Sequence, residues 1–414
     1  MKIAIIGSGI SGLTLAYYLN KKYNVTLFEK EDRIGGHTHT HTLKINQDII
    51  KVDSGFIVFN KKTYPNFIKL LKELKVSYQP SSMSFSVQST LNRLEYAGNN
   101  LKTLFAQKKN LLNIYFWRLL WEILKFNKLA KKILQKPELI ENLTIQEFVN
   151  KHNFSEYFLD NYLLPMSSAI WSSSYKDIKK FSLLFFLNFL NNHGMININD
   201  RPQWLTIKNG SETYVQKIVS QLKGKIKLNS AISNVFRNNG KCIIEMNKKK
   251  LKFDFVFFAC HADQALKLIK NPNLLEKNIL GSFKYSSNKA VLHQDINMMP
   301  KNKSIWSAWN YIIKNKSTSK ASVTYNMNIL QNITPKHDLL VSLNSDHDIN
   351  PKAILKSMIY THPKFNLNTY LNQKKQHLIC KNGFAFSGAY WGNGFHEDGV
   401  VSALNAIKYS GINP

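Results

Sequence analysis

The pattern of apolar and polar positions predicts an α/β unit at the start of the chain. Residues 2–6 (KIAII) form a short apolar run that ends in glycines, as a buried parallel strand does. Apolar residues then recur at helical spacing over 10–21, and residues 24–30 (NVTLFEK) have the pattern of a second strand. This order of strand, helix and strand predicts a βαβ unit.

Helical and strand-like patterns alternate over the rest of the chain. Helices are expected over 64–74, 101–136, 144–192, 209–222 and 399–410. Strands are expected over 43–59, in three pieces between 225 and 260, over 289–343 and over 384–388. Some of these helices and strands are inserted between segments that look like one α/β domain, so the domains are expected to be discontinuous in sequence. The first comprises 1–60, 205–265 and 375–414, and the second, of mixed helices and strands, comprises 61–204 and 266–374.

Length and composition are those of a globular protein of two domains. The chain has 414 residues, of which 44% are hydrophobic. Its net charge is +30, but only five of the 56 basic residues are arginine and the lysines are scattered. Nucleic-acid sites concentrate arginine, so we expect no nucleic-acid binding and only a weak attraction to anionic membrane surfaces.

The cysteines and the apolar runs bear on the compartment. Cys242, Cys260 and Cys380 lie far apart without a CxxC pair, so they predict neither a disulfide framework nor a zinc site. The longest apolar run, 181–190, is about half of the roughly 18 residues that a membrane-spanning helix needs. Glycines interrupt the N-terminal apolar run, unlike that of a signal peptide. We expect a cytoplasmic protein, at most peripheral at the inner face of the membrane.

Residues 7–12 (GSGISG) match the GxGxxG fingerprint of dinucleotide-binding proteins. The fingerprint lies where its mechanism requires, directly after a strand and at the start of a helix, whose free N–H groups attract phosphate. Glu29 ends the second strand, where an acid accepts hydrogen bonds from ribose hydroxyls and repels a 2′-phosphate. The cofactor-binding residues predicted from this pattern are Gly7, Gly9, Ile10, Ser11, Gly12 and Glu29.

A second motif narrows the choice of cofactor. Glu29, Arg33, Gly35 and Gly36 form an ExxxRxGG pattern, with Lys30 inside it. This pattern resembles the FAD-binding flavoprotein superfamily that includes monoamine oxidase, protoporphyrinogen oxidase and phytoene desaturase. The resemblance implies that FAD is the cofactor, that the arginine and the paired glycines pass close to the pyrophosphate, and that the first domain is a Rossmann-like FAD-binding domain of the glutathione-reductase type.

The resemblance extends over essentially the whole chain. Residues 52–60 (VDSGFIVFN) resemble the segment under the flavin ring, 229–235 (NSAISNV) the strand that holds the adenine, and 384–404 the closing motif beside the flavin pyrimidine. With GGHTHT, YPNF, RPQW and GFHEDG they resemble a bacterial group of amine-oxidase-like FAD proteins. The further cofactor residues that this implies are Gly55, Phe56, Ile57, Ile232, Gly388, His396, Asp398 and Gly399.

The run His37, His39 and His41 allows two interpretations. Imidazoles two residues apart on a strand share one face, with Thr38 and Thr40 on the other, and three of them can bind zinc or copper. However, the run follows the paired glycines, so the resemblance makes it the neck of the FAD site, where His37 and Thr38 reach the cofactor. We favour cofactor lining, expect no metal, and leave open a covalent flavin on His37.

The chemistry must come from residues around the flavin. By its context, Lys289 resembles the lysine that many superfamily members place near flavin N5 through a water; the alternative is an ordinary surface lysine. His193, from the segment 191–204, and His396, from the closing loop, are the other catalytic candidates. An aromatic pair near 306–309 is expected to divide between core and pocket. The candidate substrate residues are Arg201, Trp204, Trp309 and Tyr390.

These residues predict an FAD-dependent oxidoreductase that removes a hydride equivalent from a small organic molecule. The helix around 111–136 carries Trp117 and Trp121 and a basic face with Lys125, Lys128 and Lys132, which would suit a membrane surface. That helix, and the lack of an obvious carboxylate cluster for an ammonium group, favour an apolar, lipid-like substrate. Amine oxidation is the alternative, followed by a redox-neutral isomerase or an FAD-binding scaffold.

Overall fold

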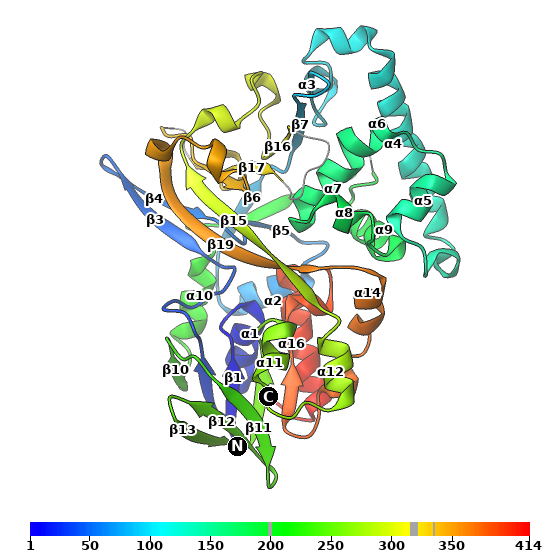
Figure 1. Cartoon of the computed structure of the whole chain (residues 1–414). Coiled ribbons are helices and arrows are strands. Elements are labelled where there is room, and N and C mark those ends of the chain that lie inside the picture. The colour runs from blue at the N-terminus through cyan, green and yellow to red at the C-terminus, as the bar shows by residue number, and fades with distance from the viewer. Residues whose placement is uncertain (198–200, 315–321, 334–335) are drawn as a thin grey trace.

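A parallel five-stranded sheet forms the base of the molecule (Figure 1). The structure is a computed structural model that describes residues 1–197, 201–314, 322–333 and 336–414. All four strand pairs are parallel. The strand order is β10 (Lys225–Lys227), β2 (Asn24–Phe28), β1 (Lys2–Ile6), β14 (Phe255–Phe258) and β20 (Phe384–Phe386). The predicted βαβ unit is confirmed, and segments from the start, middle and end of the chain complete the sheet.

Two helices pack closely together beside this sheet. They are α1 (Ile10–Leu19), directly after β1, and α16 (His396–Ser410), which ends the chain. A Cβ atom on Gly399 would lie 2.6 Å from Cγ2 of Ile10, so glycine permits this close approach. The remaining elements of this region are α10 (Glu212–Val219), α11 (Ala262–Leu268), α12 (Leu274–Leu280), α15 (Gln376–Ile379) and the antiparallel sheet of β11 (Asn234–Asn238), β12 (Lys241–Met246) and β13 (Lys249–Phe253).

The upper part of the molecule is built on a seven-stranded sheet (Figure 1). Its order is β19 (Ile354–Lys364), β15 (Lys284–His293), β18 (Leu340–Leu343), β17 (Val323–Asn326), β16 (Trp309–Ile313), β7 (Phe85–Ser89) and β8 (Leu94–Ala97). Helices cover one side of this part, namely α4 (Ile114–Ile133), α5 (Ile145–Lys151), α6 (Glu156–Phe158), α7 (Leu164–Trp171), α8 (Tyr175–Ile178) and α9 (Leu183–Asn192).

Smaller elements connect the two parts. The hairpin β3 (Thr40–Ile45) and β4 (Asp48–Asp53) leads into a small sheet of β5 (Val58–Asn60), β9 (Trp204–Ile207) and β6 (Tyr78–Ser81). Helix α2 (Pro65–Glu73) lies between β5 and β6 in sequence, and α14 (Leu367–Gln373) follows β19. Of the described residues, no helix combines the length and the hydropathy needed to cross a bilayer.

The buried side chains form two main cores. The first surrounds the parallel sheet, and the second lies between the seven-stranded sheet and the helices. The cores depart from the expected boundaries at two places: Phe67 and Leu70 of α2 pack in the first core, and Leu43 and Val52 of the hairpin pack in the second. The division into an FAD-binding domain and a substrate domain therefore stays a proposal.

Several of the expected elements were wrong in detail, including the helix over 144–192, which is divided into the helices α5 to α9. The single helix over 101–136 is interrupted, because Asn113 is the N-cap of α4 and its side chain accepts hydrogen bonds from the N–H groups of Tyr115 and Phe116. A short helix, Leu101–Leu104, and a 3₁₀ turn, Lys108–Leu112, precede it. The strand-like region 289–343 contains the short helix α13 (Met327–Leu330), and its residues 315–321 and 334–335 lie outside the described residues.

Candidate cofactor and active site

The turn between β1 and α1 leaves open space at the start of the helix. Gly7 has a φ of +103°, and a Cβ atom there would lie 2.7 Å from the Ala259 carbonyl oxygen, so glycine is required. Gly9 is the N-cap of α1, and a Cβ atom on it would meet nothing within 4 Å. Of the residues in the described ranges, none caps α1 through its side chain, and the first turn of α1 contains no acid. The positive end of the helix is thus open to a pyrophosphate.

Ser8 links the turn to the end of β2. Its N–H and its hydroxyl both donate to Oε2 of Glu29, at 2.9 and 2.6 Å, and its Oγ accepts from the N–H of Gly35 at 3.3 Å. The carboxylate of Glu29 is buried at the end of the second strand, as the fingerprint predicts. Sequence analysis missed Ser8, whose only signal is its place between the first two glycines.

The loop after β2 is held against the start of α1. The guanidinium of Arg33 donates to the carbonyl oxygens of Gly36, at 2.7 Å, and Thr38, at 3.2 Å. A Cβ atom on Gly36 would lie 3.0 Å from Cα of Gly9, so the paired glycines let this loop pass close to the open helix end. Lys30 differs: its side chain is mostly exposed and pairs with the neighbouring Glu31.

Only the end of the histidine run lies on a strand, because β3 begins at Thr40 and His37 lies in a turn before it; this corrects the expected alternation over the whole run. His39 and His41 still lie together, with ring centroids 4.0 Å apart. His39 Nδ1 lies 3.1 Å from the Tyr360 hydroxyl and His41 Nε2 lies 2.8 Å from the Ser54 hydroxyl. The ring of His37 lies 5.2 Å from that of Tyr360, centroid to centroid. The hydroxyls of Thr38 and Thr40 instead form hydrogen bonds with His396 and with the N–H of Glu212, respectively. Within the described part of the chain, no three His, Cys, Asp or Glu residues are grouped to hold a metal ion.

Thr38 belongs to a buried polar group at the start of α16. Its hydroxyl lies 2.5 Å from the Tyr214 hydroxyl and 3.0 Å from His396 Nε2, and Tyr214 lies 3.2 Å from the same nitrogen. The His396 ring stacks on Phe56 with centroids 3.5 Å apart and planes at 11°. Burial lowers the pKa of His396 well below its usual range, so the imidazole is neutral at pH 7.

Two further histidines lie near His37, and sequence analysis missed both. His362, from β19, has its ring centroid 5.2 Å from that of His37, and His261 stacks on Tyr285 at 4.4 Å. Burial lowers the pKa of His37 and His261 to about 4 and that of His362 to about 3. Nε2 of His37 is buried without a hydrogen-bond partner among the residues that the structure describes. A polar group of a bound cofactor would satisfy it.

Asp53 connects the histidine hairpin to both parts of the molecule. Its carboxylate accepts hydrogen bonds from the Ser211 N–H at 3.0 Å and hydroxyl at 2.8 Å, from Thr40 at 2.5 Å and from the Gln331 amide at 3.0 Å. Ser211 is the N-cap of α10, so a negative charge lies at the positive end of that helix. Burial raises the pKa of Asp53 to about 6, against the opposing effect of these hydrogen bonds.

Two of the other predicted cofactor residues, Gly55 and Gly388, allow neighbouring atoms to pack closely against the backbone. A Cβ atom on Gly55 would lie 2.1 Å from the His37 carbonyl oxygen, and one on Gly388 would lie 2.3 Å from the Tyr390 ring. Ile57 is partly buried, packed against the second core. Ile232 lies in the segment before β11 and not in a strand, which corrects the expected strand over 229–235. That segment still adjoins Glu29, because the N–H of Ser230 donates to the Glu29 carbonyl oxygen at 2.8 Å.

Lys289 does not lie in this site. On β15 the side chains alternate, so Asn288 is buried and donates to Nδ1 of His362 at 2.9 Å, whereas Lys289 is turned outward. Its ammonium is about half exposed and pairs with Asp346 at 2.8 Å. The context that pointed to Lys289 identified the strand but not the face of the strand, and Asn288 is the residue that faces inward.

The remaining candidates are dispersed. His193 stacks on Trp204 with ring centroids 6.0 Å apart, so these two lie together. Arg201 is exposed and donates to the Asn197 carbonyl, and residues 198–200 beside it lie outside the described residues. Trp309 packs edge-on against Tyr325, and Tyr390 is buried against Phe283 and Trp391. The structure therefore does not bring the four predicted substrate residues into one site.

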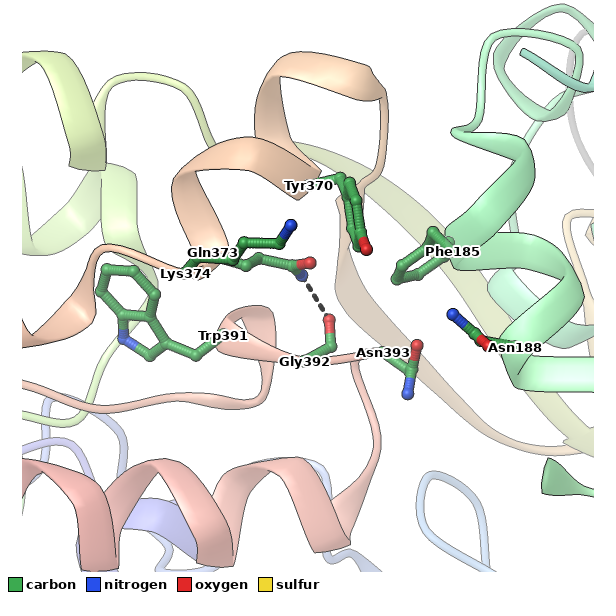
Figure 2. Close-up of a pocket in the computed structure, with 8 residues that line it drawn as sticks. All are labelled: Phe185, Asn188, Tyr370, Gln373, Lys374, Trp391, Gly392 and Asn393. Carbon is green, nitrogen blue, oxygen red and sulfur yellow. Dashed lines mark hydrogen bonds between the residues drawn. The ribbon is translucent and has the colours of Figure 1, made fainter. Parts of the chain in front are cut away.

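Two cavities adjoin the closing loop around Asn393. One, of about 280 Å³, lies between α9, α14 and residues 391–393 (Figure 2). In it the amide of Gln373 donates to the Gly392 carbonyl at 2.5 Å. The other, of about 370 Å³, is lined by residues of α2, α9 and α16, namely Lys62, Thr63, Tyr64, Pro65, Asn192, His193, Asn393, Phe395, Glu397 and Asp398.

Both carboxylates of the larger cavity are already used within the protein. Glu397 accepts hydrogen bonds from the backbone N–H groups of Asn66, at 3.1 Å, and Phe67, at 2.8 Å, at the start of α2. Asp398 accepts from the N–H of Phe395 at 2.9 Å, at the start of α16, and burial raises its pKa to about 6. His193, on the same wall, donates from Nδ1 to the Phe189 carbonyl, and burial lowers its pKa to about 4.

Together, the parallel sheet, the open helix end and the glycine loop are the features of a dinucleotide-binding fold. The family model for flavin containing amine oxidoreductases matches residues 10–310. The chain belongs to this family and is a flavin-dependent oxidoreductase.

Solved structures of similar fold cover nearly the whole chain. The putative protoporphyrinogen oxidase of Exiguobacterium sp. 255-15 has a TM-score of 0.68 at 14% identity, covering 98% of both chains. Cyclohexylamine oxidase of Brevibacterium oxydans IH-35A has a TM-score of 0.69 at 14% identity, again over 98% of both chains. The CLA-producing fatty acid isomerase of P. acnes has a TM-score of 0.71 at 12% identity, over 98% of this chain and 97% of its own. At these identities the likeness shows the fold alone.

The similarity to one of the matching curated proteins is confined to a short segment. That protein is 4,4'-diapolycopen-4-al dehydrogenase of Metabacillus indicus, 65% identical over 37 residues. The match covers 9% of this chain and 8% of that protein, so it bears on one local motif and not on the whole enzyme.

Proposed function

We propose that this protein is an FAD-dependent oxidoreductase that removes a hydride equivalent from an apolar, lipid-like molecule. The observation that carries the choice of cofactor is the open N-terminus of α1, with Gly9 facing empty space and the Arg33 loop against it. Glu29, at the end of β2, suits ribose hydroxyls, and the unpaired Nε2 of His37 suits a polar cofactor atom. When bound, FAD supplies the acceptor for the hydride equivalent.

The side chains of the protein would position the reacting groups and exclude water from them. His396 is neutral and lies within hydrogen-bond distance of the hydroxyls of Thr38 and Tyr214, so its Nε2 can exchange a proton with either. His193 donates from Nδ1, which leaves Nε2 of its neutral ring as an acceptor at the wall of the larger cavity. We therefore keep His193 and His396 as catalytic candidates and withdraw Lys289, which pairs with Asp346 on the outer face of β15.

The occupied carboxylates favour an apolar substrate over an amine. Glu397 and Asp398 line the larger cavity, but both accept backbone hydrogen bonds at helix starts. An ammonium group would have to compete for them, whereas Tyr64 and Phe395 offer apolar contact. Among proteins of this fold, one is named a fatty acid isomerase and another cyclohexylamine oxidase, so amine oxidation and isomerisation stay as alternatives.

The proposal extends to compartment and partners. Cys242, Cys260 and Cys380 are unpaired thiols, as a reducing cytoplasm would keep them. The partner that we expect is a small molecule, and nucleic acid is not among the expected partners because the arginines are few.

An absorbance spectrum of the purified protein is the first test. We expect a yellow protein that releases FAD to the supernatant after acid precipitation; colour retained in the pellet would instead point to a covalent flavin on His37. Anaerobic mixing with unsaturated fatty acids or polyenes should then bleach the flavin, and admitting an electron acceptor should restore it. Bleaching by primary amines but not by lipids would overturn the substrate proposal. Turnover of a lipid without any bleaching would favour the isomerase.

A further inference from the structure

A stripe of apolar side chains runs along the outer face of α4. Ile114, Trp117, Trp121 and Leu124 are spaced by three, four and three residues, so they share one face of the helix. Each is at least half exposed, from 50% for Trp117 to 76% for Ile114. The buried residues of the opposite face are Phe116, Leu119, Phe126 and Ala130.

The stripe continues into the turns before the helix. Leu111 and Leu112, in the 3₁₀ turn, are 50% and 93% exposed, and Leu101 is 75% exposed. Single exposed apolar residues are ordinary, but four on one helix face, with further ones in the turns before it, are typical of a surface that binds a partner. We name this set the α4 surface; it consists of Leu101, Leu111, Leu112, Ile114, Trp117, Trp121 and Leu124.

Positive charge surrounds the α4 surface. Between residues 101 and 133 the sequence has eight lysines and arginines but a single acid, Glu122. Glu122 is buried, accepts hydrogen bonds from Ser155 and pairs with Arg118 at 3.7 Å, so it offsets one of these charges and leaves the lysines in excess. Lys128 and Lys132 extend the exposed face toward the C-terminal end of the helix, and Lys125 lies over the Trp121 ring at 5.4 Å.

We propose that the α4 surface docks on an anionic lipid bilayer, with α4 lying flat in the headgroup region. Tryptophan and leucine suit the boundary between headgroups and acyl chains, and the surrounding lysines suit anionic headgroups. A second copy of this chain fits less well, because pairing two such surfaces would bring two sets of lysines together. Figure 1 shows α4 on the outer edge of the upper part, far from α1 and α16, so a bilayer there leaves the cofactor end clear. The proposal does not depend on the identity of the substrate.

The test is co-sedimentation of the full-length protein with vesicles. Vesicles of phosphatidylcholine alone are compared with vesicles that also contain phosphatidylglycerol. We expect binding to the anionic vesicles that weakens with salt, and a loss of at least about tenfold in Trp117→Glu/Trp121→Glu. The matched control is Leu274→Glu, because Leu274 is 76% exposed at the first position of α12, outside the α4 surface. Its binding should equal that of the wild type.

Several results would overturn the proposal. Wild-type protein that stays in the supernatant with anionic vesicles is one, and equal binding by the double variant and the control is another. If sedimentation velocity shows an oligomer that the double variant loses, the occupant is a second copy and not a bilayer. Should the double variant fail to fold, Lys128→Glu/Lys132→Glu tests the same surface through its charge and should lose binding to a similar extent.

Discussion

Gly9 gives the sharpest test of the cofactor site. In this structure a methyl group on Gly9 would meet no atom within 4 Å, so Gly9→Ala introduces no clash inside the protein. Gly9 is the N-cap of α1, where alanine is less favourable than glycine by about 0.5 kcal/mol. The variant should therefore fold. The new methyl group would instead occupy the space that we assign to the pyrophosphate.

The size of the effect follows from the cost of overfilling a close contact. Inserting a methyl group where two surfaces already touch costs about 1–3 kcal/mol. Since about 1.4 kcal/mol corresponds to a factor of ten in an equilibrium constant, Gly9→Ala should weaken FAD binding by about fivefold to 150-fold.

The assay is a titration of flavin-free protein with FAD, followed by the quenching of flavin fluorescence. Gly98→Ala is the control, because a methyl group on Gly98 also meets nothing within 4 Å but lies after β8, in the other part of the molecule. Melting of each variant without FAD shows whether it is folded. Unchanged affinity in Gly9→Ala, or equal weakening in Gly98→Ala, would refute the assignment of the open helix end to the cofactor.

Three further predictions concern single side chains. Lys289→Ala should leave the rate of flavin reduction unchanged. It should alter the free energy of unfolding by at most about 1 kcal/mol, because the Lys289–Asp346 ion pair is exposed. A tenfold loss of the reduction rate would restore Lys289 as a catalytic candidate. Burial lowers the pKa of His193 from 6.5 to about 4, so the unfolded state binds the extra proton between these pH values. The free energy of unfolding should thus fall as pH falls through this window, by at most about 3 kcal/mol for this group. In urea unfolding, the free energy of His193→Phe should depend less steeply on pH than that of the wild type. Parallel pH curves of the two proteins would contradict the prediction. Asp53→Asn places an amide where Ser211 donates two hydrogen bonds, so it should lose about 2–3 kcal/mol of unfolding free energy at pH 7.5. Asp48→Asn, at a partly exposed carboxylate, should change it little.

Local sequence determined the βαβ unit at the start of this protein. The strand, the glycine turn and the helix at residues 2–19 are neighbours in the chain, so their geometry depends on short-range sterics that a motif can encode. The opposite faces of Thr40 and His41 also follow from sequence, because side chains alternate along the strand β3 that contains both.

Tertiary structure decided which distant residues join that start. Thr38 meets Tyr214 and His396, which lie 176 and 358 positions further along the chain, and no local pattern specifies such a meeting. The face of a strand is equally a tertiary choice: a shift of one residue exchanges inside for outside, which is why Asn288 and not Lys289 reaches His362. The sequence predicts the strand, but the side chain that faces inward is determined only by the packing of β15 against β19 and β18.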